Sequence, residues 1–360
     1  MIGARRGRPG RSASVDVGPV YRSTLGFYDA GASPSHVVDP SVSGSPLAEL
    51  AAGGRATHAF ELLGNETRLA ILVALWESHE PFGEDTAVRF SELYARVGTT
   101  DSSQFNYHLD RLTDHFVDST TGGYELSEAG LTFVRAVIAG AGIEEPTLEP
   151  TEIDTVCTLC GGSVMIMYES GWVYILCAEC DGLWMETEVD RYGVLGKFSL
   201  SPAGVANRAP NEIYAAAWVS TYQRVHSMIE GVCPTCSGQV ERSFGICDDH
   251  ESEGRCPNCE RNNRIIARFR CSVCKMGIRS TVGSVAKYHP AVVGFYYDHG
   301  LKLQHGFNDL AHITRRLNLG STNVEQSSDD PPRVRVTVEI DDDEIWVVLD
   351  ENLSVVDIGE

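Results

Sequence analysis

The cysteines carry the clearest chemical signal in this chain of 360 residues. Ten of the eleven form Cys-x-x-Cys pairs, and all eleven lie between Cys157 and Cys274. Side chains at this spacing bind a metal ion or form disulfides. The N-terminus MIGARRGRPGRSAS is basic but lacks the apolar core of a secretory signal, so we expect a cytoplasmic chain. In that compartment the pairs favour metal over disulfides.

The first cysteine unit is CTLCGGSVMIMYESGWVYILCAEC, which begins at Cys157. Residues 164–168 and 172–176 are predicted strands around the turn ESG. In an antiparallel hairpin the start of one strand lies beside the end of the other, so both cysteine pairs meet at the open end. Four thiolates then surround one tetrahedral Zn²⁺, as in a zinc ribbon. The predicted ligands are Cys157, Cys160, Cys177 and Cys180.

The second unit repeats this scheme with strands predicted at 239–247 and 263–271. Its open end would hold one zinc ion, and the elaborated tip CDDHESEGRCPNC would hold another through three cysteines and a histidine. A cross-brace of Cys233 and Cys236 with Cys256 and Cys259 is the rival arrangement, and His250 could be a plain loop histidine. The predicted ligands are Cys233, Cys236, Cys271 and Cys274 at the open end, and Cys247, His250, Cys256 and Cys259 at the tip.

Three structural zinc ions are therefore expected, because four-thiolate sites leave no position open for water. The site with His250 could exchange its metal and is the one sensor candidate. The sequence contains no G-x-S-x-G, H-E-x-x-H, phosphate-loop or dinucleotide motif, so we do not expect an enzyme. It also contains no apolar run long enough to span a membrane.

A helical segment follows each ribbon, at 209–231 and at 289–301. The aromatic side chains of these segments either line a ligand pocket or pack in a core or dimer interface; small zinc modules have little core of their own. They are Tyr214, Trp218, Tyr222, Phe295 and Tyr296.

Residues 56–141 read as helix, helix, helix, hairpin and helix, the order of a winged helix-turn-helix domain. Asn65 and Ser91 are placed to cap helices, and Gly98 suits the turn between two of them. Helical spacing predicts one set of core side chains, and VDSTTGGYELS alternates as a hairpin would. The predicted core set is Phe60, Leu63, Leu69, Leu72, Leu75, Leu93, Val97, Phe105, Leu109, Leu112 and Phe116.

The helix that starts at Ser102 leaves polar side chains outside this core set. Gln and Asn can pair with adenine edges, Arg with guanine, and Ser with phosphate or base. Tyr107 and His108 could equally be packing or capping residues. The predicted DNA contacts are Ser102, Ser103, Gln104, Asn106, Tyr107, His108 and Arg111.

Three separated blocks, FELLGNETRLAILVAL, SSQFNYHLDRL and GYELSEAG, resemble the ArsR-like winged-helix regulators of archaea. The resemblance covers about 85 residues and implies sequence-specific binding of double-stranded DNA, usually by a homodimer. Metal-sensing members of that family carry two cysteines where this chain has Tyr94 and Arg96, so that sensing site is absent.

The charge opposes this expectation. The chain has a formal net charge of −21, and residues 56–140 contain 13 acidic residues against five arginines. Only four of the 29 basic residues are lysines, a composition typical of proteins from salt-loving archaea, although an acid-rich mesophile protein fits too. At 1 M salt the screening length is about 3 Å, so repulsion from phosphates costs little.

The remaining segments complete an α+β chain. We expect a disordered extension or mispredicted start at 1–55, linkers at 142–152 and 319–332, ribbon units at 153–231 and 232–318, and a β-hairpin or meander at 333–360. The expected function is transcription regulation through DNA, with zinc ribbons for dimerisation, contact with the transcription machinery or effector sensing. The alternative is a zinc-ribbon scaffold for protein or RNA, whose winged helix contacts only proteins.

Overall fold

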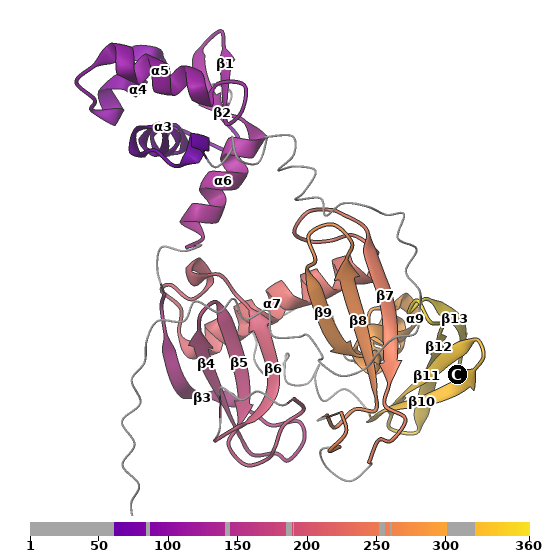
Figure 1. Ribbon diagram of the computed structural model, residues 1–360. Coiled ribbons are helices and arrows are strands. Elements are labelled where there is room, and N and C mark those ends of the chain that lie inside the picture. Colours follow the sequence, from indigo (N-terminus) through magenta and orange to yellow (C-terminus); the bar gives the residue numbers. More distant parts are fainter. Residues whose placement is uncertain are drawn as a thin grey trace, which may run out of the picture. The chain divides into compact units, whose positions relative to one another are not determined.

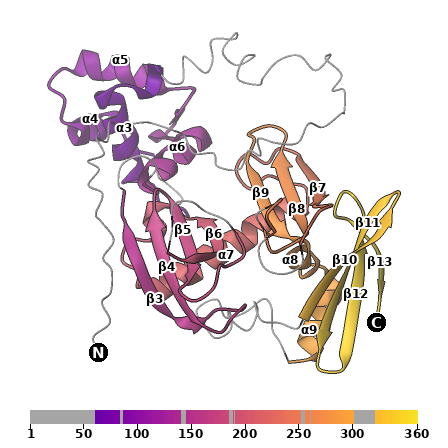
Figure 2. The same cartoon turned by 60° about the horizontal axis from the view of Figure 1, so that its bottom comes forward.

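The computed structural model describes residues 61–83, 87–140, 145–184, 189, 191–251, 256–259, 261–300 and 321–360. The extension predicted at 1–55 and the core residue Phe60 lie outside this part. The described chain is α+β, as expected, with four separate antiparallel sheets (Figures 1 and 2). None of its helices combines the length and the apolar character needed to cross a membrane.

The region from residue 61 to 140 has the predicted order of elements. Asn65 caps the first complete helix, since its Oδ1 accepts a hydrogen bond from the Arg68 amide at 3.1 Å. Gly98 ends the next helix with a φ of 69°, a left-handed conformation that favours glycine. Ser91 is not a cap, because that helix begins one residue earlier and follows Arg89. The elements are α3 (Glu66–Trp76), α4 (Phe90–Val97), α5 (Ser102–Leu112), β1 (Val117–Thr120), β2 (Gly123–Leu126) and α6 (Glu128–Ile138).

The core of this helical region differs from prediction on α3. Leu72 and Leu75 are buried as expected, but Leu69 is 37% exposed and Ile71 is fully buried in its place. The segment LAILVALW is apolar on nearly every side, so its periodicity does not reveal which side faces inward. Packing against α4 and α5 decides it.

The first cysteine-rich region is a four-stranded sheet of β3 (Leu148–Val156), β4 (Ser163–Glu169), β5 (Trp172–Cys177) and β6 (Gly193–Ser199), followed by α7 (Pro210–Ile229). The hairpin of β4 and β5 has the predicted position. The linker predicted at 142–152 is wrong at its C-terminal end, because residues from Leu148 onward pair with β4. Ile153 is the one fully buried residue of β3 and most of its side chains are polar, which gives this strand the composition of a linker.

The second region is a three-stranded sheet of β7 (Val240–Ile246), β8 (Ile265–Cys271) and β9 (Gly277–Thr281), with helices α8 (Val282–Ala286) and α9 (Pro290–Asp298). Its hairpin also matches the prediction. The C-terminal sheet contains β10 (Ser321–Asp329), β11 (Pro332–Ile340), β12 (Asp343–Leu349) and β13 (Val355–Gly359). Its last three strands are the expected meander. The linker predicted at 319–332 is wrong from Ser321 onward, because the polar strand β10 pairs along β11 through its backbone.

Buried side chains of β8, α8, α9 and the C-terminal sheet belong to one core. Helix α7 contributes Tyr214 to the core of the first sheet and Met228 to this second core. Tyr214 and Tyr296 are almost completely buried, and Trp218 packs edge-on against Phe198 at 4.9 Å between ring centroids. Tyr214 and Tyr296 therefore pack in the protein interior, and Trp218 is half-buried.

Candidate functional site

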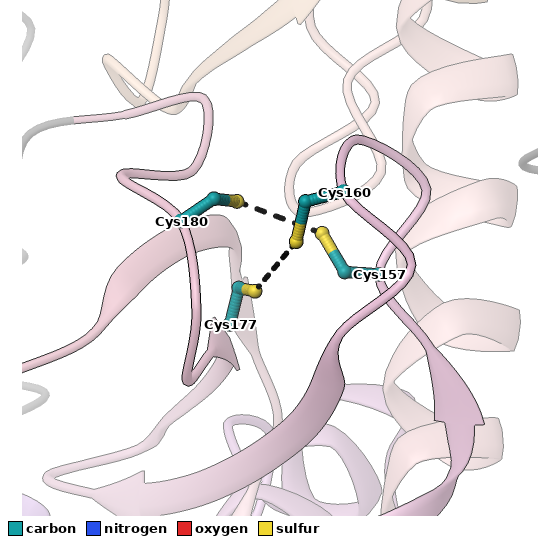
Figure 3. Close-up of side chains that lie close together, drawn as sticks. All are labelled: Cys157, Cys160, Cys177 and Cys180. Atoms are coloured by element: carbon teal, nitrogen blue, oxygen red, sulfur yellow. Dashed lines mark hydrogen bonds between the residues drawn. The ribbon is translucent and has the colours of Figure 1, made fainter.

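The first cysteine group lies at the open end of the β4–β5 hairpin (Figure 3). Cys157 and Cys160 precede β4, and Cys177 ends β5 directly opposite Val164. The sulfur atoms of Cys157 and Cys180 are 3.7 Å apart, and those of Cys160 and Cys177 are 3.5 Å apart. The four sulfur atoms point toward one another and all lie within 4.8 Å, so the group is positioned to hold a metal ion.

These distances exclude disulfides and suit a tetrahedral metal site. A disulfide requires sulfur atoms about 2.05 Å apart. Sulfur ligands about 2.3 Å from a tetrahedral Zn²⁺ lie about 3.8 Å from one another. The observed separations of 3.5 and 3.7 Å are close to that tetrahedral edge.

The second group repeats this arrangement at the open end of the β7–β8 hairpin. The sulfur atoms of Cys233 and Cys274 are 3.6 Å apart, and those of Cys236 and Cys271 are 3.5 Å apart. Cys233 and Cys236 therefore lie with Cys271, which ends β8, and with Cys274, and the rival cross-brace does not occur.

The third group lies at the opposite end of that hairpin. It consists of Cys247, His250, Cys256 and Cys259, with their ligand atoms within 4.8 Å of one another. His250 Nδ1 is 3.4 Å from the Cys259 sulfur, close to the distance of about 3.6 Å expected for tetrahedral nitrogen and sulfur ligands of one zinc ion. Three of these residues are half-buried, whereas Cys256 is fully buried. The structure thus has two ligand groups in one hairpin, as the sequence predicted.

A common backbone turn positions the cysteines. The amides of Cys157, Cys233, Cys256 and Cys271 each donate to the carbonyl five residues later, at 2.8 to 3.1 Å. The turn curls the chain so that backbone N–H groups also point at sulfur; the amides of Leu159 and Gly162, for example, lie 3.4 Å from cysteine sulfurs. The four ligands of each group come from segments that are distant in sequence, but each turn forms within one short segment.

Hydrogen bonds at the sulfur atoms favour the thiolate form that metals bind. The amides of Cys274 and Val273 donate to the Cys271 sulfur at 3.4 Å and lower the pKa of that thiol to about 6. Burial raises the pKa of Cys256, but donation from backbone amides outweighs it and lowers the pKa to about 7. Burial and neighbouring sulfurs raise the pKa of Cys180 to about 12, so a metal must displace its proton.

A second candidate site is the surface of α5. Phe105, Leu109 and Leu112 are fully buried and fix this helix to the core. The other sides of the helix carry an exposed polar surface with one aromatic ring, since Tyr107 is 55% exposed. The predicted contacts exposed on it are Ser102, Ser103, Gln104, Asn106 and Tyr107.

Two predicted DNA contacts of α5, His108 and Arg111, are not part of this exposed surface. His108 is only 7% exposed and lies against Arg68, so its prediction as a DNA contact is wrong. Helical spacing placed it beside Leu109 on the margin of the apolar face, where packing decides exposure. Arg111 is half-buried; its Nε is buried and makes no hydrogen bond in the described structure.

The sequence reading missed Asp101. Its carboxylate accepts hydrogen bonds from the Ser103 hydroxyl and from the amides of Ser103 and Gln104, at 2.6 to 3.2 Å. The hydroxyl bond, followed by the two amide bonds, lowers the pKa of Asp101. Aspartate immediately before a helix is a common capping signal and could have identified it. Asp101 therefore fixes the start of α5 and occupies the hydroxyl of a predicted contact.

Comparison with known proteins places both candidate sites in families. Residues 154–355, more than half of the chain, match the family described as Domain of unknown function (DUF7351). The chain belongs to the DUF7351 family. Residues 56–137 match a second family, described as Domain of unknown function (DUF7347). No curated protein and no solved structure matches the chain.

The two matches leave residues 138–153 between them, a stretch that contains the last residue of α6 and most of β3. The DUF7351 match contains all three ligand groups, and the DUF7347 match contains α5. The metal groups and the α5 surface thus belong to separately defined units of one chain.

Proposed function

We propose that the chain is a transcriptional regulator that binds double-stranded DNA in a sequence-specific manner. In this proposal residues 61–140 are a winged helix, with α4 and α5 as the helix-turn-helix and the β1–β2 hairpin as the wing. The cysteine-rich hairpins are zinc ribbons.

The exposed polar surface of α5 carries this proposal. Three fully buried side chains brace the helix, so the opposite surface is held rigidly and presents two amides, Gln104 and Asn106. Amides pair with adenine in the major groove, and the guanidinium of Arg111 would pair with guanine after a small rotation outward. A surface selected only for solubility has no need of this combination.

Zinc is the proposed metal because four thiolates, or three thiolates and an imidazole, are its usual structural ligands. Chelated zinc would hold each hairpin closed at its end and would supply no water for catalysis. The ribbons would then serve a homodimer or a contact with the transcription machinery. A two-fold dimer would read two half-sites.

The acidity of residues 56–140 limits the conditions in which this function can operate. In molar salt the screening length is about 3 Å, so repulsion between the acidic residues and the DNA phosphates is weak. Contacts with the bases and with the shape of the DNA must then supply the affinity. We therefore propose binding in concentrated salt, as in the cytoplasm of a halophile.

The test compares two triple variants of the full-length, metal-loaded protein. Gln104, Asn106 and Arg111 are replaced by alanine in one, and Gln223, Asn352 and Arg333 in the control, which removes the same three side-chain types from exposed positions elsewhere. Binding to duplex from the protein's own promoter region is measured by fluorescence anisotropy in about 2 M KCl. We expect the α5 variant to lose binding and the control to keep it. Equal binding by both variants would favour the alternative of a zinc-ribbon scaffold for protein or RNA.

A further inference from the structure

A side-chain hydrogen bond joins the segments that follow the first and third ligand groups. Asn262, three residues after Cys259, donates through Nδ2 to the carbonyl of Gly182, which lies two residues after Cys180. The two partners are 80 residues apart in sequence. The bond therefore connects the end of one Cys-x-x-Cys pair with the end of another that belongs to a different ligand group.

The third ligand group holds the backbone on both sides of Asn262. The Cys256 amide donates to the carbonyl of Arg261 at 3.1 Å, and the Cys247 amide donates to the carbonyl of Arg264 at 3.0 Å. Asn262 lies between these two carbonyls, so its position follows the positions of two ligands. A metal ion that fixes the ligand atoms of this group would fix the segment that carries Asn262 as well.

On the other side of the bond, Gly182 is tied to the first ligand group. Its amide donates a hydrogen bond to the Cys180 sulfur. Gly182 is buried with a φ of 71°, and a Cβ atom there would come within 2.4 Å of the Val194 carbonyl oxygen. A Cβ atom at Gly193 would come within 1.9 Å of the Cys180 carbonyl oxygen. Because the chain from Cys180 to Gly182 is so closely surrounded, a shift of Gly182 is transmitted to Cys180.

The bond lies in surroundings that are largely closed to water. Asn262 Oδ1 and Asn263 Nδ2 are both buried and have no hydrogen-bond partner in the described structure. A hydrogen bond to a buried carbonyl matters more than an exposed one, since its loss leaves that carbonyl unpaired. Asn263 is half-buried like Asn262 but donates no such bond, so it offers a matched comparison.

We propose that Asn262 couples metal binding in the third ligand group to metal binding in the first. An occupied third group holds Asn262 against Gly182 and so stabilises the backbone from which Cys180 acts as a ligand. Loss of the third metal removes this support and weakens metal binding by the first group. Asn262 is thus a positioning residue, and the occupancy of the third group is communicated to the first ribbon.

This coupling is reciprocal, because each metal must raise the affinity for the other by the same factor. It rests on the proposed function only in taking zinc as the metal, and DNA has no part in it. The metal content of the wild-type protein, measured first, tests the assignment of zinc separately from the coupling.

The experiment follows labelling of cysteines by N-ethylmaleimide in full-length, metal-loaded protein exposed to excess chelator. Peptide mass spectrometry gives separate rates for Cys160 of the first group and Cys236 of the second, whose side chains are both exposed. We expect Cys247→Ser, which removes a ligand of the third metal, and Asn262→Ala each to raise the Cys160 rate roughly fivefold. The Cys236 rate should stay unchanged in both variants. Asn263→Ala should match the wild type at both cysteines.

Two further variants make the outcome decisive. The double variant of Cys247→Ser and Asn262→Ala should label Cys160 no faster than either single variant, because both changes remove the same support. Asn262→Asp keeps the size of the side chain but removes the Nδ2 donor, so it should act like Asn262→Ala. An unchanged Cys160 rate in Cys247→Ser or in Asn262→Ala would overturn the proposal. An equal rise at Cys160 and Cys236 would overturn it too, since it would show a general loss of stability.

Discussion

Arg68 and His108 meet in the interior of the helical region, 40 residues apart in sequence. Arg68 Nη1 lies 3.4 Å from His108 Nδ1, and the Arg68 guanidinium also donates to the carbonyls of Leu62 and Glu61. Arginine only donates, so Nδ1 must accept and the imidazole proton lies on Nε2. The pair ties α5 to α3 and to the segment that precedes α3.

This contact predicts a pH-dependent stability of the helical region. Burial, followed by the charge of Arg68, lowers the pKa of His108 below its ordinary value of 6.5. The unfolded chain then binds the proton more readily, so stability is complete above about pH 6.5 and declines as the pH falls below it. Thermal unfolding followed by circular dichroism at several pH values should show this decline.

The decline should be weaker in His108→Gln. It should persist in His115→Gln, which changes an exposed histidine of the same region. An identical pH dependence in wild type and His108→Gln would show that another group is responsible.

We expect the Asp110 carboxylate to weaken DNA binding in the wild-type protein. Its carboxylate accepts a hydrogen bond from Asn106 Nδ2 at 3.0 Å on the exposed surface of α5. Asp110→Asn removes a negative charge from this surface while keeping an oxygen that can accept from Asn106, so we expect operator affinity to rise roughly two- to fivefold. Anisotropy titrations with Asp342→Asn, on the exposed turn before β12, provide the charge-matched control. A loss of affinity in Asp110→Asn would mean that the charged carboxylate is needed to position Asn106.

Phe105 and Leu69 should differ sharply as contributors to stability. Phe105 is fully buried and packs edge-on against Phe90 and Tyr94, with ring centroids 5.3 Å apart in each pair, whereas Leu69 is 37% exposed. Phe105→Ala should lower the free energy of unfolding by about 3–5 kcal/mol, and Leu69→Ala by about 1 kcal/mol or less. Chemical denaturation measures both, and similar losses would argue that α3 packs with a different side inward.

Three metal ions per chain are expected by elemental analysis of the purified protein. Cys247→Ser should lower that number to two without unfolding the hairpin, because its group lies beyond the paired parts of β7 and β8. Cys271→Ser should lower it as well and should destabilise the second core, in which Cys271 is buried. Two ions or fewer in the wild-type protein would contradict the geometry of the third group.

A chelator titration should distinguish the three groups. The third group has an imidazole where each of the other two groups has a fourth thiolate, so we expect it to lose its metal first. Loss of metal from the first or second group before the third would contradict this order. We expect protein that has lost only the metal of the third group to keep its DNA binding, because removal of that metal leaves α5 unchanged.

The ligand sets could be predicted from the sequence because they depend on local turns and on single hairpins. Four of the five Cys-x-x-Cys pairs form the same local turn, and the hairpin between two pairs brings them together regardless of the rest of the fold. The apolar alternation of β4, β5, β11 and β12 was likewise visible. These elements each bury one face, which leaves a period of two in the sequence.

The strands β3 and β10 could not be predicted in the same way. Both lie at sheet edges and expose mainly polar side chains, so backbone pairing with a neighbour defines them, and composition does not. The burial of His108 depends on Arg68, a residue of another helix. Contact between the α5 surface and DNA bases remains a prediction, because an exposed side chain in the free protein has the same geometry whether its partner is water or a base.

The measurement that tests the central claim most directly is the ratio of affinities for two duplexes of equal length and composition. One carries the site selected from the protein's own promoter region, and the other carries the same bases in scrambled order. In about 2 M KCl we expect the wild-type protein to prefer the selected site by about 10³ or more, and the variant lacking Gln104, Asn106 and Arg111 to show a ratio near one. A wild-type ratio near one, in folded protein with its metals bound, would contradict the claim that α5 reads DNA.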